Sequence, residues 1–250
     1  MSKLILFLLN ISLVLCVPPP NLVIIVADDL GYNDVSWHSP HVISPHLEYP
    51  ARESVILTHH YSQPVCTPTR AALLTGREIL CRENYYFSSE SLAVVSNCNP
   101  YRYPFHIGLQ REVIHHLNPW GLLPNLTTLA DELRSAGYAT HAVGKWHLGF
   151  CKEDYLPLNR GFDQHYGMWA GKEDYYNHTQ AQGGHMGYDF RRNMEVDESA
   201  KDVYSSILFS QHSSEIIANH DKSKPLFLYL PFQSVHSPLQ APDEYVDMCM

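Results

Sequence analysis

Charge is scarce in this sequence, and positive charge is scarcer than negative. Charged side chains make up 17% of the 250 residues, and 17 basic residues face 26 acidic ones, for a net charge of −9. This balance argues against a general nucleic-acid binder, so attraction of an anionic substrate would need a local basic cluster. With 45% hydrophobic residues, the length suits one large α/β domain or two smaller ones.

The sequence lacks internal repeats and any apolar run long enough to cross a bilayer. Its longest run follows Lys3 and covers roughly twelve residues, whereas a span needs about 20. Val14 and Cys16 are small enough for cleavage after Cys16, which predicts a signal peptide at residues 1–16. A buried strand or a membrane anchor is the alternative. We expect an exported protein, lysosomal or extracellular, without a transmembrane segment.

Two features bear on that secretory compartment. Sequons predict N-glycosylation at Asn125 and Asn177. Cysteines are few: of six, cleavage after Cys16 would leave an odd number, namely Cys66, Cys81, Cys98, Cys151 and Cys249. At least one of them must then lie outside any intramolecular disulfide, and Cys66 is the candidate. A disulfide between Cys81 and Cys98 stays open.

Apolar runs of strand length alternate with helical patterns along the chain. Residues 22–26 form an unbroken, β-branched run typical of a parallel strand covered on both faces. Leucines and an alanine at helical spacing from 126 to 133, with a glycine at the expected end, predict a helix before a short strand that ends at 143. A helix at roughly 201–220 precedes a third strand. These alternations predict an α/β fold with a mostly parallel sheet sandwiched by helices.

The segment 155–200 does not continue this alternation. It is rich in glycine, tyrosine and polar residues, and it is interpreted as a long surface excursion without regular structure.

Polar side chains follow each predicted strand. Asp28 and Asp29 come directly after the first, Lys145 and His147 after the second, and His236 after the third. Each alone could be a surface or loop residue. Since parallel strands place their carboxyl ends at one edge of the sheet, where open α/β sheets bind ligands, we expect these residues to converge there.

Several segments resemble the sulfatase family. The resemblance covers residues 21–77 and 101–245, and it is most similar to the arylsulfatase B (N-acetylgalactosamine-4-sulfatase) group. Its segments are "VADDLGYND", "CTPTRAALLTGR", "GYATHAVGKWHLG", "GFDQHYG" and "PLFLYLPFQSVHSPLQAP". It implies an alkaline-phosphatase-like sulfatase N-terminal domain over residues 21–250. It also implies hydrolysis of sulfate esters, either of sulfated glycosaminoglycans or of aryl sulfates.

The resemblance gives Cys66 a specific chemistry. It implies that the formylglycine-generating enzyme oxidises this cysteine in the endoplasmic reticulum to Cα-formylglycine, which hydrates to a geminal diol. One diol oxygen would attack the sulfur of the substrate, which is a sulfated carbohydrate, and expel the alcohol. The second hydroxyl would then expel sulfate. A serine could perform the first step only, because it has no second hydroxyl.

The same resemblance assigns the neighbouring residues. Asp28, Asp29 and the modified Cys66 would be ligands of one Ca²⁺ ion, which prefers hard oxygen donors. Positive charge would stabilise the anionic reaction centre.

Four further side chains would contact the diol or the sulfate. Arg70 and His147 would hold the diol, with His147 as the base of the elimination step. Lys145 and His236 would bind sulfate oxygens. If these histidines act partly protonated, activity should peak at acidic pH.

Two departures from the family pattern bear on activity. The Asp-Asn pair that completes the calcium site, and a further sulfate-binding lysine, are not found before Met250. Residues 78–100 interrupt the family pattern, as a genuine surface loop or as untranslated sequence. We expect an incomplete domain, whose activity as a 250-residue chain is open.

Two other functions remain as alternatives. One is a catalytically inactive isoform or gene-model fragment, which could act as a binding protein. The other is a phosphodiesterase of the alkaline-phosphatase-like group, against which Cys66 argues, because those relatives use threonine or serine with zinc.

Overall fold

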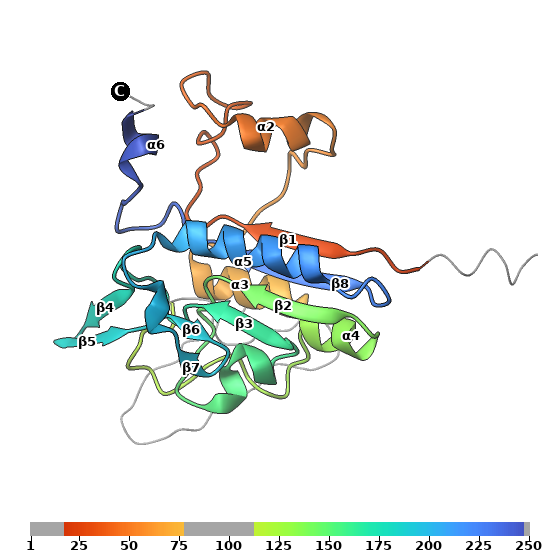
Figure 1. Cartoon of the computed structure of the whole chain (residues 1–250), viewed down its shortest axis with the longest axis vertical. Coiled ribbons are helices and arrows are strands. Elements are labelled where there is room, and N and C mark those ends of the chain that lie inside the picture. Colours follow the sequence, from red (N-terminus) through yellow and green to blue (C-terminus); the bar gives the residue numbers. More distant parts are fainter. Residues whose placement is uncertain (1–17, 78–112, 248–250) are drawn as a thin grey trace, which may run out of the picture.

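The computed structural model describes residues 18–77 and 113–247. The predicted signal peptide, the segment 78–100 with Cys81 and Cys98, and Cys249 lie outside the described residues. Within the described part, the fold is built on a six-stranded sheet with the order β1-β8-β2-β3-β6-β7 (Figure 1). The predicted α/β class is confirmed.

Four strands of this sheet run parallel. They are β1 (Leu22–Val26), β8 (Leu226–Pro231), β2 (Ala139–Val143) and β3 (Gln164–Gly167). The short strands β6 (Arg191–Arg192) and β7 (Glu195–Val196) add antiparallel pairs at one edge. A separate antiparallel pair consists of β4 (Thr179–Gln182) and β5 (His185–Tyr188). The sheet is therefore mostly parallel, as predicted.

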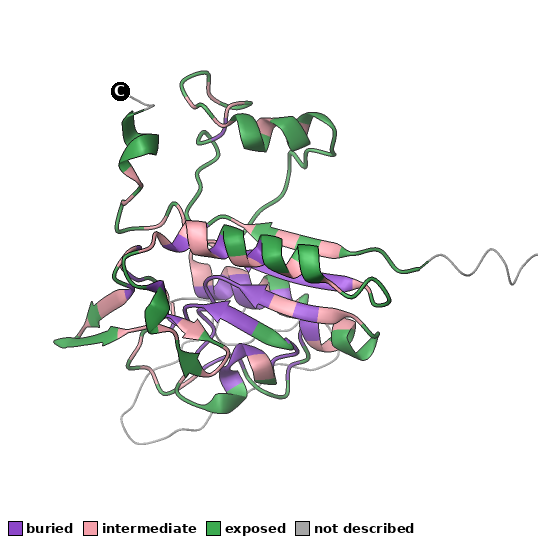
Figure 2. Cartoon of the chain, in the orientation of Figure 1, coloured by how far each residue is buried: buried purple, intermediate pink, exposed green. Residues whose placement is uncertain are grey.

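Strand β8 lies at the centre of the packing because it is buried along its whole length (Figure 2). Its side chains alternate between two apolar clusters. Phe227 and Tyr229 pack in the cluster that includes α3 (Cys66–Thr75) and α4 (Leu129–Ser135). The leucines of β8 pack in the other cluster, which includes α5 (Ser205–Asn219). Helices thus cover both faces of the central strands (Figure 1).

The helix predicted before β2 is confirmed as α4. Thr128 caps it: its side chain accepts from the Asp131 amide, and the Asp131 carboxylate accepts from the Thr128 amide. These bonds satisfy two amide groups that a helix start otherwise leaves unpaired. At the other end, Gly137 follows the capping residue with a φ of 90°, as predicted from its position.

Two expectations about the fold were wrong. Residues 155–200 are not a surface excursion, because they contribute β3 to the sheet and Phe162 to the core, where its ring stacks on Phe227 and Tyr229. The strand β1 is not covered on both faces: it lies at the sheet edge, and the side chains of Val23 and Ile25 remain 46% and 65% exposed.

The remaining elements are short. They are α2 (Pro45–Arg52), the 3₁₀ turns η1 (Glu153–Tyr155), η2 (Pro157–Asn159) and η3 (Glu198–Ala200), and α6 (Asp243–Asp247). Among the described residues, none of the helices has the length and apolar character that crossing a membrane would require.

The backbones of β2 and β8 approach each other closely at Gly144, just before Lys145. Gly144 follows β2 with a φ of 127°, and a β-carbon there would collide with the carbonyl oxygen of Pro231, the last residue of β8. The next residue, Lys145, donates its backbone N–H to that same oxygen. Because residue 144 is a glycine, Lys145 can lie directly beside the end of β8.

We expect Gly144→Ala to lower the free energy of unfolding by about 3 kcal/mol or more, because it combines a strained φ with a backbone collision. Gly137→Ala is the matched control: its φ is also positive, but a β-carbon there meets nothing within 4 Å. It should cost only about 1–2 kcal/mol. Urea unfolding of both variants would measure the difference. Equal losses would show that the close approach at Gly144 contributes nothing.

Candidate active site

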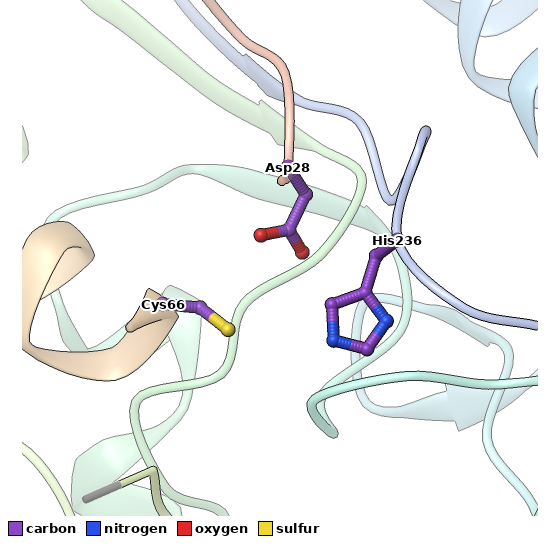
Figure 3. A group of neighbouring side chains, drawn as sticks. All are labelled: Asp28, Cys66 and His236. Carbon is purple, nitrogen blue, oxygen red and sulfur yellow. The ribbon is translucent and has the colours of Figure 1, made fainter. Parts of the chain in front are cut away.

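Three strand ends and one helix start bring the predicted residues to the same edge of the sheet. Asp28 follows β1, Lys145 follows β2, and His236 lies in the loop after β8. Cys66 is the first residue of α3. Figure 3 shows the side chains of Asp28, Cys66 and His236 pointing toward a common centre, and their metal-ligating atoms all lie within 4.8 Å of one another.

The carboxylate of Asp28 is paired with two cations. Its Oδ2 contacts Lys145 Nζ and lies 3.5 Å from Nη2 of Arg70. All three side chains are almost completely buried. Buried charges need partners, and one carboxylate cannot neutralise both a lysine and an arginine. The cluster therefore has a surplus of positive charge next to Cys66.

The hydrogen bonds of Arg70 leave part of its guanidinium available. Its Nη1 donates to the carbonyl of Lys145 at 2.8 Å, but Nε and Nη2 make no hydrogen bond of good geometry within the described residues. Burial, followed by the charge of Arg70, holds the pKa of Lys145 below its usual value, although Asp28 acts in the opposite direction. Unpaired buried donors and crowded cations favour an anion in this place.

Cys66 has the environment of an activated thiol. Burial acts to raise its pKa, but a hydrogen bond with His236 and the charge of Lys145 outweigh burial, and the pKa lies below the usual value. The same hydrogen bond to Cys66 is the main reason that the pKa of His236 is raised. Position at a helix N-terminus further favours negative charge at Cys66. Within the described residues, Cys66 and the exposed Cys151 form no disulfide.

His147 is held as a neutral imidazole. Its Nε2 donates to the carbonyl of Ile114 at 3.0 Å, and its buried Nδ1 has no hydrogen-bond partner among the described residues. Burial and the charges of Lys145 and Arg70 hold its pKa well below the usual value. The ring therefore presents an unprotonated nitrogen, which can accept a proton. Because the pKa shifts of His147 and His236 have opposite signs, the two histidines do not titrate together.

Comparison with known proteins identifies the family of this chain. The family model described as Sulfatase matches residues 20–249. The chain belongs to the sulfatase family.

Among relatives of this chain, arylsulfatase J of Mus musculus is 39% identical over 233 residues, which cover 91% of this chain and 34% of the relative. N-acetylgalactosamine-6-sulfatase of the same organism is 29% identical, with 91% and 42% covered. The crystal structure of Ps i-CgsB in complex with k-i-k-neocarrahexaose has a TM-score of 0.70 and 28% identity, over 92% of this chain and 48% of that one. The chain thus spans between about a third and about half of the length of these proteins.

Asp29 lies outside the buried cluster of Asp28, Lys145 and Arg70. Its side chain is 60% exposed, and its Oδ2 lies 3.7 Å from Nε2 of His236. The predicted glycosylation sites Asn125 and Asn177 are exposed, as attachment of a glycan requires. The structure therefore brings Asp28, Cys66 and the cationic residues together, with Asp29 at the rim. The roles assigned to all of them remain predictions.

Sequence reasoning missed Thr67, which connects the helix of Cys66 to His147. Its hydroxyl donates to the carbonyl of His147 at 3.1 Å and accepts from the amide of Ile114 at 3.0 Å. Thr67 fills a variable position of the Cys-x-Pro-x-Arg pattern, so only its burial in the fold reveals this contact.

Gly171, also missed, packs against the ring of His147. A β-carbon at Gly171 would lie 2.5 Å from both Cε1 and Nε2 of His147. We expect Gly171→Ala to displace the ring from Ile114 and to lower the free energy of unfolding by about 1–3 kcal/mol. Imidazole ¹⁵N chemical shifts would report the displacement, and urea unfolding the stability.

Gly187→Ala is the matched control, because a β-carbon there meets nothing within 4 Å and its φ is ordinary. Its stability should stay within about 0.5 kcal/mol of the wild type. If Gly171→Ala behaved like this control and left the His147 signal in place, the packing contact would have no role in fixing the imidazole.

Proposed function

We propose that this protein hydrolyses sulfate esters at Cys66. The observation that carries the proposal is the surplus of buried positive charge, with Arg70 and Lys145 sharing the single carboxylate of Asp28 beside the start of α3. A sulfate group is an anion of the size and charge that guanidinium and ammonium groups bind. Membership of the sulfatase family supports the same reaction.

Cys66 is the proposed precursor of Cα-formylglycine, whose hydrate supplies two hydroxyl groups on one carbon. The formylglycine-generating enzyme would be a partner during synthesis. The chain's own residues suit an oxygen nucleophile at this position. Against the effect of burial, a hydrogen bond with His236 and the charges of Lys145 and Arg70 lower the pKa of the thiol. The N-terminus of α3 also favours an anion at this position.

The neighbouring side chains have separate proposed roles in sulfate binding and proton transfer. Arg70 Nε and Nη2 and the Lys145 ammonium group would offset the negative charge on the sulfate oxygens. His236, the hydrogen-bond partner of Cys66, would also bind sulfate. His147 Nδ1 would accept the proton whose loss precedes release of sulfate. Burial of these groups excludes water, which strengthens each interaction.

The donor atoms are of the type that Ca²⁺ prefers, but they are fewer than a complete calcium site requires. The oxygens of Asp28 and Asp29 are the hard ligands that Ca²⁺ prefers, and residue 66 lies beside Asp28. Among the described residues these are two carboxylates, against the roughly six to eight oxygens of a calcium site. We propose Asp28, Asp29 and modified Cys66 as ligands of one Ca²⁺, which would supply further positive charge for the sulfate.

The substrate class proposed is a sulfated carbohydrate. One relative is named N-acetylgalactosamine-6-sulfatase, and the solved structure contains a neocarrahexaose. Glycosylation at the exposed Asn125 and Asn177 would suit a lysosomal or extracellular protein in the secretory pathway.

Residue 66 allows a direct test by mass spectrometry and kinetics, in a host that contains the converting enzyme. The wild type should carry an aldehyde at residue 66 and turn over an aryl sulfate. Cys66→Ala should lose at least about 10⁴-fold in kcat, as other enzymes do without their nucleophile. Cys66→Ser should bind one sulfate covalently and stop, because serine has no second hydroxyl to expel it.

Cys151→Ala is the matched control, since Cys151 is the exposed free thiol outside the site, and it should keep full activity. An unmodified thiol at residue 66 of the wild type, or retained turnover in Cys66→Ala, would refute the proposed function.

Calcium binding can be measured without activity. Saturating Ca²⁺ should raise the free energy of unfolding, by about 2.7 kcal/mol at a hundredfold excess over Kd. Asp29→Asn should reduce this gain, whereas Asp154→Asn, at an exposed aspartate on η1, should not. Equal calcium stabilisation in both variants would remove Asp29 from the site.

A further inference from the structure

The loop that carries His236 is held on both sides. On the side of β1, the amide of Asp28 donates to the carbonyl of Ser234 at 2.8 Å, and the amide of Val235 donates to the carbonyl of Asp28 at 2.7 Å. On the other side the loop contacts residues 173–175. The backbone of His236 is therefore fixed between the proposed metal-binding strand end and a separate segment.

Gln233 forms the first link to that segment. Its Nε2 donates to the carbonyl of Glu173 at 2.7 Å, and its Oε1 accepts from the amide of Glu173 at 3.2 Å. Both side chains are almost completely buried. A reciprocal pair of this kind fixes the separation and the orientation of the two segments.

The segment 173–175 is anchored by a buried hydrogen bond between Glu173 and His178. His178 Nε2 donates to the carbonyl of Ala200, and Nδ1 lies 2.9 Å from Oε1 of Glu173, with both side chains fully buried. Burial raises the pKa of Glu173 well above its usual range. A protonated Glu173 can donate to His178, so the segment is held without an unbalanced buried charge.

Tyr175 forms the second link, and it reaches His236 directly. Its hydroxyl donates to the carbonyl of His236 at 2.8 Å, and its amide donates to Oε1 of Gln240 at 2.9 Å. Burial raises the pKa of Tyr175 to about 12, so the hydroxyl stays a donor at neutral pH. The imidazole of His236 is fixed in turn, because its Nδ1 lies 2.6 Å from the carbonyl of Ser237 and donates to it.

We propose that Tyr175 is a positioning residue for His236, which it holds against Cys66 through the hydrogen bond to the His236 carbonyl. The proposed contact of His236 with sulfate rests on the proposed function; the placement of the imidazole does not. The Gln233–Glu173 pair keeps the Tyr175 segment in place for this task.

Tyr175→Phe tests the proposal, with Tyr204→Phe as the matched control. The ring of Tyr204 stacks on that of Tyr175 with centroids 5.1 Å apart, and its hydroxyl also donates to a backbone carbonyl, that of Gln240, at 2.9 Å. Each variant thus removes one hydroxyl and one hydrogen bond from the same aromatic stack. Only Tyr175→Phe removes the bond to His236.

The first measurement is the imidazole ¹⁵N spectrum of the whole protein, with the His236 signal assigned by its loss in His236→Asn. The signal should shift in Tyr175→Phe and stay in place in Tyr204→Phe, while both variants lose similar thermal stability. An unchanged signal in both variants, or an equal shift in both, would overturn the proposal. This measurement needs no catalytic activity.

The second measurement is steady-state hydrolysis of an aryl sulfate. Tyr175→Phe should raise KM about three- to tenfold, with kcat changed less than about twofold, the pattern expected when sulfate binding is weakened equally in ground and transition states. Tyr204→Phe should leave both constants unchanged. Equal KM values in the two variants would contradict the positioning role. If the wild type hydrolysed no sulfate ester, the proposed function would fail, and the His236 spectrum would decide the positioning role alone.

Discussion

The pairing of one buried carboxylate with two buried cations is the constraint on which this site depends. Asp28 lies at the end of an edge strand, yet it is buried because Lys145 and Arg70 need its charge. Isolated, each cation would carry a large desolvation cost. Asp28 also bonds through its backbone to Ser234 and Val235. The order of β1, β8 and β2 therefore fixes both the core and the electrostatics of this buried charged cluster.

The sequence predicted the parts whose physics is local. Short apolar runs followed by polar residues located β1, β2 and β8, because strands of a parallel sheet are rich in apolar residues and polar groups can gather at their ends. Leucines at helical spacing and the glycine at its end located α4. The convergence of Asp28, Lys145 and His236 followed from the parallel direction of their strands. Cys66 stood out through its family pattern, and its place at the start of α3 agrees with a reactive residue.

The parts that failed depend on contacts between distant segments. Strand β3 has four residues, too few for a periodic signal, and it sits among glycines and tyrosines that resemble a loop. The apolar side chains of Val23 and Ile25 looked buried, but their exposure depends on what packs beside β1. His147 and His236 are chemically identical, and only their surroundings shift their pKa values in opposite directions. No local pattern encodes such surroundings.

The position of β8 in the chain also sets an order in time. The strand pairs with both β1 and β2, so the sheet cannot close until residues 226–231 have been made. Cys66 is synthesised long before this strand and before His236, whose imidazole lies within 4.8 Å of its sulfur in the folded protein. At about 5–20 residues per second, that interval is roughly 10–30 s. During it, the segment around Cys66 is an accessible peptide, and an enzyme that must reach the residue can act before folding encloses it.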